Sequence, residues 1–378
     1  MDLVVLDLPP GPALLAALRR ALDGGPAIGP LDPGLPSQQR DRLLAALRPD
    51  APVGHDVAVV VATSGSTGAP KGVELTAAAL ESSARASLAR IGARPSDRWL
   101  CCLPTSHIAG IQVLVRALVL GTDPLIHQRF HVAAVAEAEA THVSLVPTML
   151  LRLLDAGVDV ARFGCILLGG ADAPPALLDR ARAAGARIVT TYGMTETAGG
   201  CVYDGHPLDG VEARVGEDGR IRIRGPVLAR GYRGRPDLDA EAFHDGWFCT
   251  ADLGRWAPDG RLEVLGRADD VIVTGGENIA PATVAGLLAE HPEVVEAAVV
   301  GRCDPEWGQR VVAVVVPTDP RQPPALEGLR RFVAERATAA HAPRELVLVD
   351  ALPLLGSGKL DRAALEGLRP ALDRLERR

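Results

Sequence analysis

The segment Val57-Ala-Val-Val-Val61-Ala-Thr63-Ser-Gly-Ser-Thr-Gly-Ala-Pro-Lys71-Gly72 joins an apolar run to a loop of small polar residues. The run over 57–61 predicts a buried strand. The loop offers backbone N–H groups and hydroxyl groups that can surround one anion, and Lys71 supplies a counter-charge. We therefore predict a phosphate-binding loop between a strand and a helix, with a flexible surface turn as the alternative. The loop residues are Thr63, Ser64, Gly65, Ser66, Thr67 and Gly68.

This loop is not a Walker A motif. Pro70 stands where the second glycine of that motif belongs, and Gly72 stands where Ser or Thr should follow the lysine. Only two of the forty basic residues are lysines, Lys71 and the Lys359 of Gly356-Ser-Gly-Lys359. An ammonium is a compact charge with three rotatable donors, unlike the planar guanidinium. The bias predicts that both positions specifically need an ammonium. The alternative for Lys359 is a solvated lysine in the tail of the chain.

Composition limits the classes of function. With 378 residues, 47% of them hydrophobic, the chain is long enough for two or more globular domains. The net charge of -7 argues against nucleic acid as a partner, because such binding neutralises phosphates with a basic face. Six irregularly spaced cysteines indicate neither a zinc ribbon nor a disulfide framework. No apolar run reaches the length of a spanning helix. We expect a cytoplasmic protein without membrane insertion.

The texture of the chain predicts an α/β fold. Short buried runs alternate with helical patterns from about residue 56 to 192, which is typical of a wound parallel sheet. Turn signals such as Glu217-Asp-Gly219 predict antiparallel hairpins over 211–266, before a second, smaller α/β region. We expect a large N-terminal domain over 1–267, a hinge at 268–270 and a small mobile C-terminal domain over 271–378. The expected strands are 57–61, 99–103, 125–127, 142–146, 166–168 and 187–191, and the expected helices are 76–91, 109–120, 131–140, 147–156 and 174–184.

The loop and five later segments together resemble the adenylate-forming superfamily, which includes acyl-CoA synthetases, luciferase and nonribosomal-peptide adenylation domains. The later segments are Tyr192-Gly-Met-Thr-Glu196, Gly246-Trp-Phe-Cys-Thr-Ala-Asp252-Leu-Gly254, Gly266-Arg267-Ala-Asp269-Asp270, Thr274-Gly-Gly-Glu-Asn278 and Gly356-Ser-Gly-Lys359. The resemblance implies the fold of that superfamily and an enzyme that uses ATP, Mg²⁺ and CoA to convert a carboxylic acid into a thioester through an acyl-adenylate.

The resemblance also implies roles for single residues. The catalytic residues would be Lys71, His107, Glu196 and Lys359, with Glu196 as the Mg²⁺ ligand and Lys359 bridging the substrate carboxylate and the α-phosphate. Carboxylate oxygen suits Mg²⁺, although a helix N-cap partner is another reading of Glu196. Besides the loop, the nucleotide would contact Gly169, Gly170, Ala171, Tyr192, Gly193, Thr195, Asp252 and Arg267. Tyr192 would stack on adenine and Asp252 would bind the ribose.

The same family pattern implies a moving C-terminal domain. Asp269 matches the hinge residue about which that domain turns between the two half-reactions. Gly275 and Gly276 would line the passage for the pantetheine arm of CoA, although a glycine pair is more often just a turn. Ala251 departs from the family pattern, which usually has glycine at this position.

The choice of acid depends on the segment Pro104-Thr-Ser-His107-Ile-Ala-Gly-Ile-Gln112-Val-Leu-Val-Arg116. Arg116 stands on an apolar helix, where a guanidinium requires a protein carboxylate or a substrate carboxylate. The His-to-Arg spacing resembles the o-succinylbenzoate:CoA ligases of menaquinone biosynthesis, whose substrate carries two carboxylates. That resemblance implies that His107 borders the acyl pocket, that Arg116 binds the carboxylate that is not activated, and that Gly199 and Gly200 make room for an aromatic ring.

Three other functions remain open at this point. The chain could be another small aryl- or acyl-CoA ligase, a stand-alone adenylation domain that loads a carrier protein, or a catalytically silent nucleotide-binding scaffold. The small-molecule partners would be a carboxylic acid, ATP and CoA, and the sequence leaves open whether two copies form a homodimer.

Overall fold

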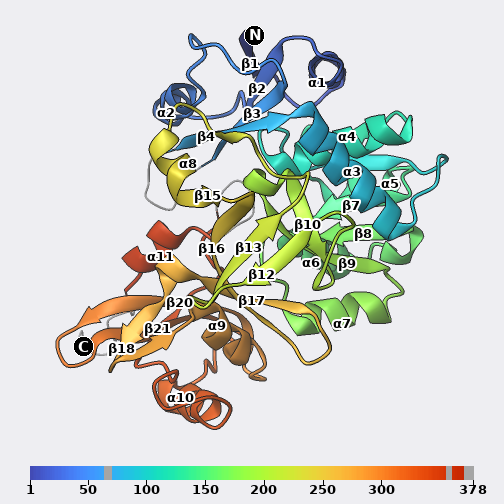
Figure 1. Cartoon of the computed structure of the whole chain (residues 1–378). Coiled ribbons are helices and arrows are strands. Elements are labelled where there is room, and N and C mark those ends of the chain that lie inside the picture. The colour runs from blue at the N-terminus through green and yellow to red at the C-terminus, as the bar shows by residue number, and fades with distance from the viewer. Residues whose placement is uncertain (64–69, 355–359, 370–378) are drawn as a thin grey trace. The chain divides into compact units, whose positions relative to one another are not determined.

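The computed structural model describes residues 1–63, 70–354 and 360–369, which fold as two compact units (Figure 1). The first unit comprises Met1–Gly216, Ile221–Thr250 and Trp256–Leu262. The second comprises Glu217–Arg220, Ala251–Arg255 and the described residues from Glu263 onward. The predicted α/β class, with a large and a small part, is confirmed. The exact domain boundaries stay a prediction, because these units divide the chain within the 211–266 region.

The first sheet has the order β1-β2-β3-β4-β14. Its strands are β1 (Leu3–Asp7), β2 (Ala27–Leu31), β3 (Val57–Thr63), β4 (Lys71–Thr76) and β14 (Gly231–Tyr232). β1, β2 and β3 are parallel, while β4 runs antiparallel to both β3 and β14. The first 55 residues thus extend the sheet that carries the predicted phosphate loop, together with helices α1 (Pro12–Leu22) and α2 (Ser37–Leu47).

The loop after β3 leads to a strand rather than to a helix, which corrects the predicted strand–loop–helix order. Residues 73–76 alternate between buried and half-buried positions, as a strand with one face on the core does. The helix α3 (Ala77–Ile91) begins only after Thr76, whose side chain accepts a hydrogen bond from the Ala79 N–H at 3.0 Å. The loop is therefore the connection of an antiparallel pair.

The second sheet has seven strands in the order β11-β10-β9-β8-β7-β5-β6. They are β5 (Trp99–Cys101), β6 (Leu125–Ile126), β7 (His142–Leu145), β8 (Cys165–Leu168), β9 (Ile188–Met194), β10 (Gly199–Tyr203) and β11 (His206–Pro207). The five strands from β5 to β9 are parallel, as predicted, and β10 and β11 add an antiparallel edge. The run over 57–61 belongs to the first sheet, so the alternating region contributes strands to two sheets.

Helices cover both faces of this seven-stranded sheet (Figure 1). α3 and α4 (Ile108–Leu120) pack on the face that presents Trp99, Cys101 and Cys165. The other face presents Leu100 and Ile166 to a separate core. That core is formed with α5 (Val132–Glu137), α6 (Pro147–Asp155) and α7 (Pro175–Ala183), and the short helix η1 (Val160–Arg162) contributes Val160.

The predicted hairpin region is confirmed. β12 (Glu212–Val215) pairs antiparallel with β13 (Arg220–Arg224), and β15 (Phe243–His244) pairs antiparallel with β16 (Trp247–Trp256). The short helix α8 (Pro236–Ala242) precedes β15, and β17 (Leu262–Arg267) pairs with β16.

The second unit is built on a sheet of order β19-β18-β21-β20, with β22 parallel to β21. Its strands are β18 (Ile272–Thr274), β19 (Glu277–Ile279), β20 (Val294–Asp304), β21 (Gly308–Pro317) and β22 (Glu345–Leu348). Its helices are η3 (Ala268–Asp270), α9 (Pro281–Ala289), α10 (Leu326–Ala334) and α11 (Arg362–Gly367). In the part of the chain that the structure describes, no helix has the length and apolarity needed to cross a bilayer.

Candidate active site

The two ends of the predicted phosphate loop are fixed by strand pairing. Thr63 ends β3 and lies opposite Lys71, the first residue of β4. The Thr63 hydroxyl donates to the carbonyl oxygen of Lys71 at 3.3 Å. The predicted loop residues Ser64, Gly65, Ser66, Thr67 and Gly68 lie outside the described residues, as does Lys359. The pairing of β3 with β4 therefore fixes the position of Lys71 at the end of the loop.

A tight turn between β9 and β10 carries Glu196. The short helix η2 (Thr195–Thr197) forms this turn, and Ala198 continues it in the left-handed region with φ of 49°. The Met194 N–H donates to the Thr197 hydroxyl at 3.0 Å, and the Ala198 N–H donates to the Thr195 carbonyl at 3.0 Å. These bonds hold Glu196 with only 7% of its surface exposed.

Lys71 and Glu196 meet directly. Nζ of Lys71 lies 3.1 Å from Oε1 of Glu196, and the Tyr232 hydroxyl donates to the same oxygen at 2.9 Å. Nζ also lies 4.0 Å from the centroid of the Tyr232 ring. The structure thus brings together the predicted phosphate-binding lysine and the predicted metal-binding carboxylate. A largely buried charge pair is stable only with such additional hydrogen bonds.

Tyr232 was missed by the sequence reasoning. It lies in Ala229-Arg-Gly-Tyr232-Arg233, a segment that was read only as part of the hairpin region. A signal was present, because the chain has three tyrosines and this one stands between two arginines and beside a glycine. A buried tyrosine hydroxyl needs a hydrogen-bond partner, which here is a carboxylate.

The residues at this position fit a Mg²⁺ ion that arrives with phosphates. The ammonium of Lys71 already places a positive charge against Oε1 of Glu196. Among the described residues there is no group of three or more His, Cys, Asp or Glu side chains that could form an all-protein metal cage. Mg²⁺ usually binds through one or two carboxylates, substrate phosphates and water, which matches a single carboxylate.

The predicted nucleotide-binding positions lie near the ends of two neighbouring strands of the seven-stranded sheet. Gly169, Gly170 and Ala171 follow β8, and Tyr192 and Gly193 lie in the last part of β9, just before Thr195. A Cβ at Gly193 would lie 2.1 Å from the carbonyl oxygen of Gly199 on β10, so only glycine permits this close approach. Ligands in such sheets bind beyond the carboxyl ends of the strands.

Helix α4 presents the predicted acid-binding residues. His107 is its exposed N-cap residue. Arg116 is 5% exposed and donates from Nη1 to the Ser144 hydroxyl at 3.1 Å, and its guanidinium carbon lies 4.8 Å from the Trp99 ring centroid. Its Nε has no hydrogen-bond partner among the described residues. Burial lowers the pKa of Arg116, while the weaker influence of Tyr203 raises it. Within residues 1–63, 70–354 and 360–369, no carboxylate forms an ion pair with this guanidinium.

The small residues expected to make room for an aromatic ring pack against protein side chains. A Cβ at Gly199 would lie 3.0 Å from Cγ of Gln112, and one at Gly200 would lie 2.9 Å from Cε1 of Tyr203. The Gln112 amide donates to the Leu80 carbonyl at 3.1 Å, whereas its Oε1 has no hydrogen-bond partner in the described part of the chain. Gly199 therefore lets α4 and β10 approach each other, Gly200 leaves room for the Tyr203 ring, and the space directly over both glycines is occupied.

In the second unit, Arg267 joins the predicted ribose-binding and hinge residues. Its Nη1 lies 3.8 Å from Oδ1 of Asp252, and its Nη2 donates to Oδ2 of Asp269 at 2.7 Å. Desolvation alone would lower the pKa of Arg267, but the hydrogen bond and charge of Asp269, followed by Asp252, raise it. Gly275 and Gly276 form the turn between β18 and β19; a Cβ at Gly275 would lie 2.9 Å from the Trp307 ring, whereas Gly276 is open.

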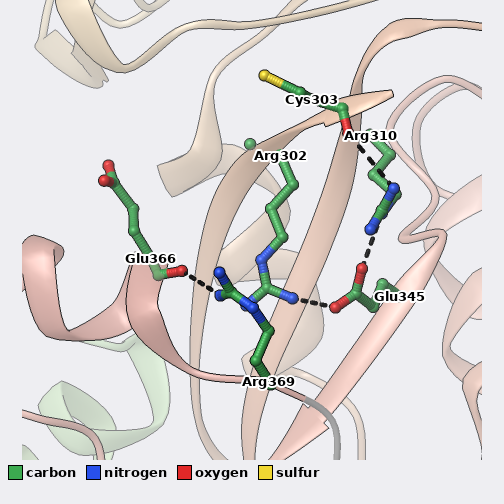
Figure 2. Close-up of a pocket in the computed structure, with 7 residues that line it drawn as sticks. Arg302, Cys303, Arg310, Glu345, Glu366 and Arg369 are labelled. Carbon is green, nitrogen blue, oxygen red and sulfur yellow. Dashed lines mark hydrogen bonds and ion pairs between the residues drawn. The ribbon is translucent and has the colours of Figure 1, made fainter. Parts of the chain in front are cut away.

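A polar basin of about 500 Å³ lies elsewhere in the second unit (Figure 2). Glu345 accepts hydrogen bonds from Arg302 and from Nε of Arg310, the latter at 2.7 Å. Arg302 also donates to the Leu368 carbonyl, and Arg369 donates to the Glu366 carbonyl at 2.7 Å. These bonds use the cations of the basin to tie the segment after α11 to the sheet, so we assign it a structural role.

Comparison with known proteins identifies the family. The AMP-binding enzyme family matches residues 29–233, and the AMP-binding enzyme C-terminal domain matches residues 284–359. The chain belongs to the AMP-binding enzyme family, which confirms the resemblance seen in its motifs.

Two known proteins, one of them in two complexes, illustrate the similarity. A probable 2-succinylbenzoate–CoA ligase of Mycobacterium tuberculosis is 46% identical over 381 residues, covering 95% of this chain and 97% of the relative. The o-succinylbenzoate CoA synthetase (MenE) of Bacillus subtilis, in complex with the acyl-adenylate intermediate OSB-AMP, superimposes with a TM-score of 0.86 at 30% identity, covering 98% of this chain and 89% of the other. Its complex with ATP and a magnesium ion gives a TM-score of 0.84 at 29% identity, covering 97% and 89%.

Proposed function

We propose that this protein is an ATP-dependent acid:CoA ligase that converts 2-succinylbenzoate, ATP and CoA into 2-succinylbenzoyl-CoA, AMP and pyrophosphate, as required in menaquinone biosynthesis. The observation that carries the proposal is the meeting of Lys71 and Glu196 beside the loop of an AMP-binding enzyme. The choice of acid is supported by the near full-length similarity to a probable 2-succinylbenzoate–CoA ligase.

The reaction needs charge neutralisation because a carboxylate is a poor acyl donor. In the first half-reaction a substrate carboxylate oxygen attacks the α-phosphate of ATP, and the bond to the leaving pyrophosphate breaks. In the second, the CoA sulfur attacks the acyl carbon and AMP leaves. Groups placed where negative charge develops lower the barrier most. We assign this task to Lys71 at the β- and γ-phosphates and to Lys359 at the α-phosphate and the acyl carboxylate.

Glu196 is the proposed Mg²⁺ ligand. Bound there, Mg²⁺ supplies positive charge that offsets the charge of the phosphates. When ATP binds, the Lys71 ammonium leaves Oε1 of Glu196 and turns to the phosphates, so that it exchanges one anionic partner for another. The ion pair at 3.1 Å keeps both groups compensated until then.

The remaining roles follow the family pattern. Tyr192 is proposed to stack on adenine beside Gly169, Gly170 and Ala171. Asp252 accepts hydrogen bonds from the ribose hydroxyls, while Arg267 binds ribose or phosphate oxygen. Asp269 is the proposed hinge residue, and Gly275 and Gly276 are proposed to line the pantetheine passage.

Arg116 is proposed to select a diacid. A buried guanidinium without a carboxylate partner in the described part of the chain is unfavourable unless an anion joins it. The carboxylate of 2-succinylbenzoate that is not activated is such an anion. His107, at the exposed start of the same helix, is proposed to border the acyl pocket.

The test is a panel of acids assayed for pyrophosphate release and, by mass spectrometry, for the thioester with free CoA. We expect turnover with 2-succinylbenzoate and a thioester of the corresponding mass. Turnover with benzoate instead would replace the acid and retain the reaction class. Pyrophosphate release without a CoA thioester would favour a carrier-protein loading enzyme, and no release with any acid would favour a silent nucleotide-binding scaffold.

We also propose a cytoplasmic location. All six cysteines are free, which suits a reducing compartment that also holds ATP and CoA. A homodimer stays a prediction that size-exclusion chromatography with light scattering can test.

A further inference from the structure

We propose that Tyr232 is a positioning residue, which orients the carboxylate of Glu196 toward Mg²⁺ and holds the ammonium of Lys71 beside it. The inference rests on the proposed function, because it assumes that Glu196 binds the metal of the Mg·ATP complex. It concerns a residue that belongs to none of the motifs by which the family was recognised.

The backbone around Tyr232 connects the strand that carries Lys71 with the turn that carries Glu196. Tyr232 lies on β14 opposite Val73 of β4, the strand that begins with Lys71. Three residues earlier, the Ala229 N–H donates to the Glu196 carbonyl at 2.8 Å. The segment over 229–232 is therefore hydrogen-bonded to both the lysine strand and the glutamate turn, which are remote in sequence.

The side chain of Tyr232 repeats this connection through its own two functional groups. Its hydroxyl donates to Oε1 of Glu196 at 2.9 Å, while its ring face lies 4.0 Å from Nζ of Lys71. An aromatic face attracts a cation through the ring quadrupole, and a hydroxyl that donates to a carboxylate restrains the orientation of its plane. One side chain thus contacts the anion and the cation of the pair.

Tyr232 is itself held firmly enough to serve as a reference point. It is 6% exposed, and its ring centroid lies 5.8 Å from that of Phe243. Its N–H donates to Oδ1 of Asp239 at 2.6 Å. Gly231 has φ of 153°, and a Cβ there would lie 2.8 Å from the same carboxylate, so glycine is required for this contact.

The hydroxyl matters most when the ion pair opens. Both contacts that the described residues make with the Glu196 carboxylate fall on Oε1. With Lys71 turned to the phosphates, the Tyr232 hydroxyl would still hold Oε1, and Glu196 would be oriented to bind Mg²⁺. Without the hydroxyl, the carboxylate loses this donor and must be ordered by the metal itself, which weakens metal binding.

The test compares Tyr232→Phe with Tyr203→Phe by calorimetric titration of ATP, in the absence of acid and CoA, at a series of fixed Mg²⁺ concentrations. Tyr232→Phe keeps the ring over Lys71 and removes only the hydroxyl. Tyr203→Phe is the matched control, because the Tyr203 hydroxyl is also buried and bonded, to Ser87 at 2.7 Å. Direct counting of bound Mn²⁺ by electron paramagnetic resonance gives a second readout that does not depend on turnover.

We expect Tyr232→Phe to raise the Mg²⁺ concentration required for half-maximal ATP binding by about tenfold, the usual effect of a lost hydrogen bond to a charged group. Metal-free ATP affinity should stay unchanged, and Tyr203→Phe should alter only thermal stability. An unchanged Mg²⁺ requirement in Tyr232→Phe, or an equal loss with and without metal, overturns the positioning role alone. A wild-type protein whose ATP binding ignores Mg²⁺ overturns the proposed function as well.

Discussion

Nζ of Lys71 lies 3.1 Å from Oε1 of Glu196, so the groups proposed for phosphate and for metal neutralise each other before either ligand binds. Opposite charges at this distance and partial burial attract strongly, and their separation must be offset by the charges of Mg·ATP. ATP offers Lys71 a new anionic partner, and Mg²⁺ offers Glu196 a new cationic partner. ATP and Mg²⁺ are therefore expected to bind cooperatively.

Lys71→Arg is expected to weaken ATP binding by tenfold or more, although the charge is retained. The planar guanidinium is larger than the ammonium that fits between Glu196 and the Tyr232 face, and it donates in a fixed fork. Calorimetric titration of ATP measures the loss. Arg85→Lys, at an exposed site on α3 paired with Glu81, is the reverse swap and should leave ATP affinity unchanged.

Lys359→Ala is expected to lower the rate of acyl-adenylate formation by about 10²-fold or more while changing ATP affinity little. An interaction formed mainly in the transition state lowers kcat without a matching loss of ground-state binding. Pyrophosphate release and ATP titration give the two quantities. Losses of similar size in both would assign Lys359 to simple nucleotide binding.

Arg116→Ala is expected to raise KM for 2-succinylbenzoate by tenfold or more and to spare an acid with one carboxylate. Loss of a charge-assisted hydrogen bond accounts for this magnitude. Ser144→Ala removes a neighbour that accepts from Arg116 and tests whether the arginine is held in place by it. An equal rise in KM for both acids would identify Arg116 as a structural residue.

Arg233→Met is expected to lower the free energy of unfolding by about 3–5 kcal/mol, the usual effect of breaking a buried ion pair. The side chain of Arg233 is 3% exposed and donates to Glu74 at 2.8 Å and to the carbonyl oxygens of Leu47, Arg48 and Ala51. Urea denaturation measures the change. Arg230→Met, whose side chain is 47% exposed, should lower stability by about 1 kcal/mol or less.

The protein is expected to lose stability as the pH rises above about 9. Burial raises the pKa of Cys101 from 9.0 to about 12, and the same cause raises that of Cys201 to about 12. Below pH 9 the thiols are protonated in both states and contribute nothing. Above it the unfolded chain releases protons that the native protein retains, so unfolding becomes easier by about 1.4 kcal/mol per pH unit for each thiol.

Urea titrations at pH 8 and pH 10 measure this effect, and Cys201→Ala should show a smaller difference between the two. A thiol reagent under native conditions should modify the exposed Cys303 first. Rapid modification of Cys101 or Cys201 would contradict the burial on which the pH dependence rests.

The sequence predicted the wound sheet well because its strands and helices carry local periodicity. The runs that became β5 and β8 are apolar throughout, and α4 is an apolar helix interrupted only by buried Gln112 and Arg116. The motifs also paired Lys71 with Glu196 in function before their contact was visible.

The parts that escaped prediction depend on tertiary contacts. β2 has the sequence Ala-Ile-Gly-Pro-Leu, whose glycine and proline disfavour a strand, yet all five residues are buried between neighbours. The bond between Tyr232 and Glu196 joins residues 36 positions apart, and no local pattern announces it. Residues 73–76 alternate as a strand should, but the loop before them led to the prediction of a helix.

The contacts of Arg233 limit how many residues could be removed from the N-terminus of an engineered variant of this enzyme. Any deletion that removes the carbonyl oxygens of residues 47–51 would strand a guanidinium inside the protein, directly after the tyrosine that touches both reactive charges. The end of α2 and the residues that follow it are therefore joined by a single arginine to the segment that carries Tyr232, and a deletion that reaches residues 47–51 should impair folding together with the placement of that tyrosine.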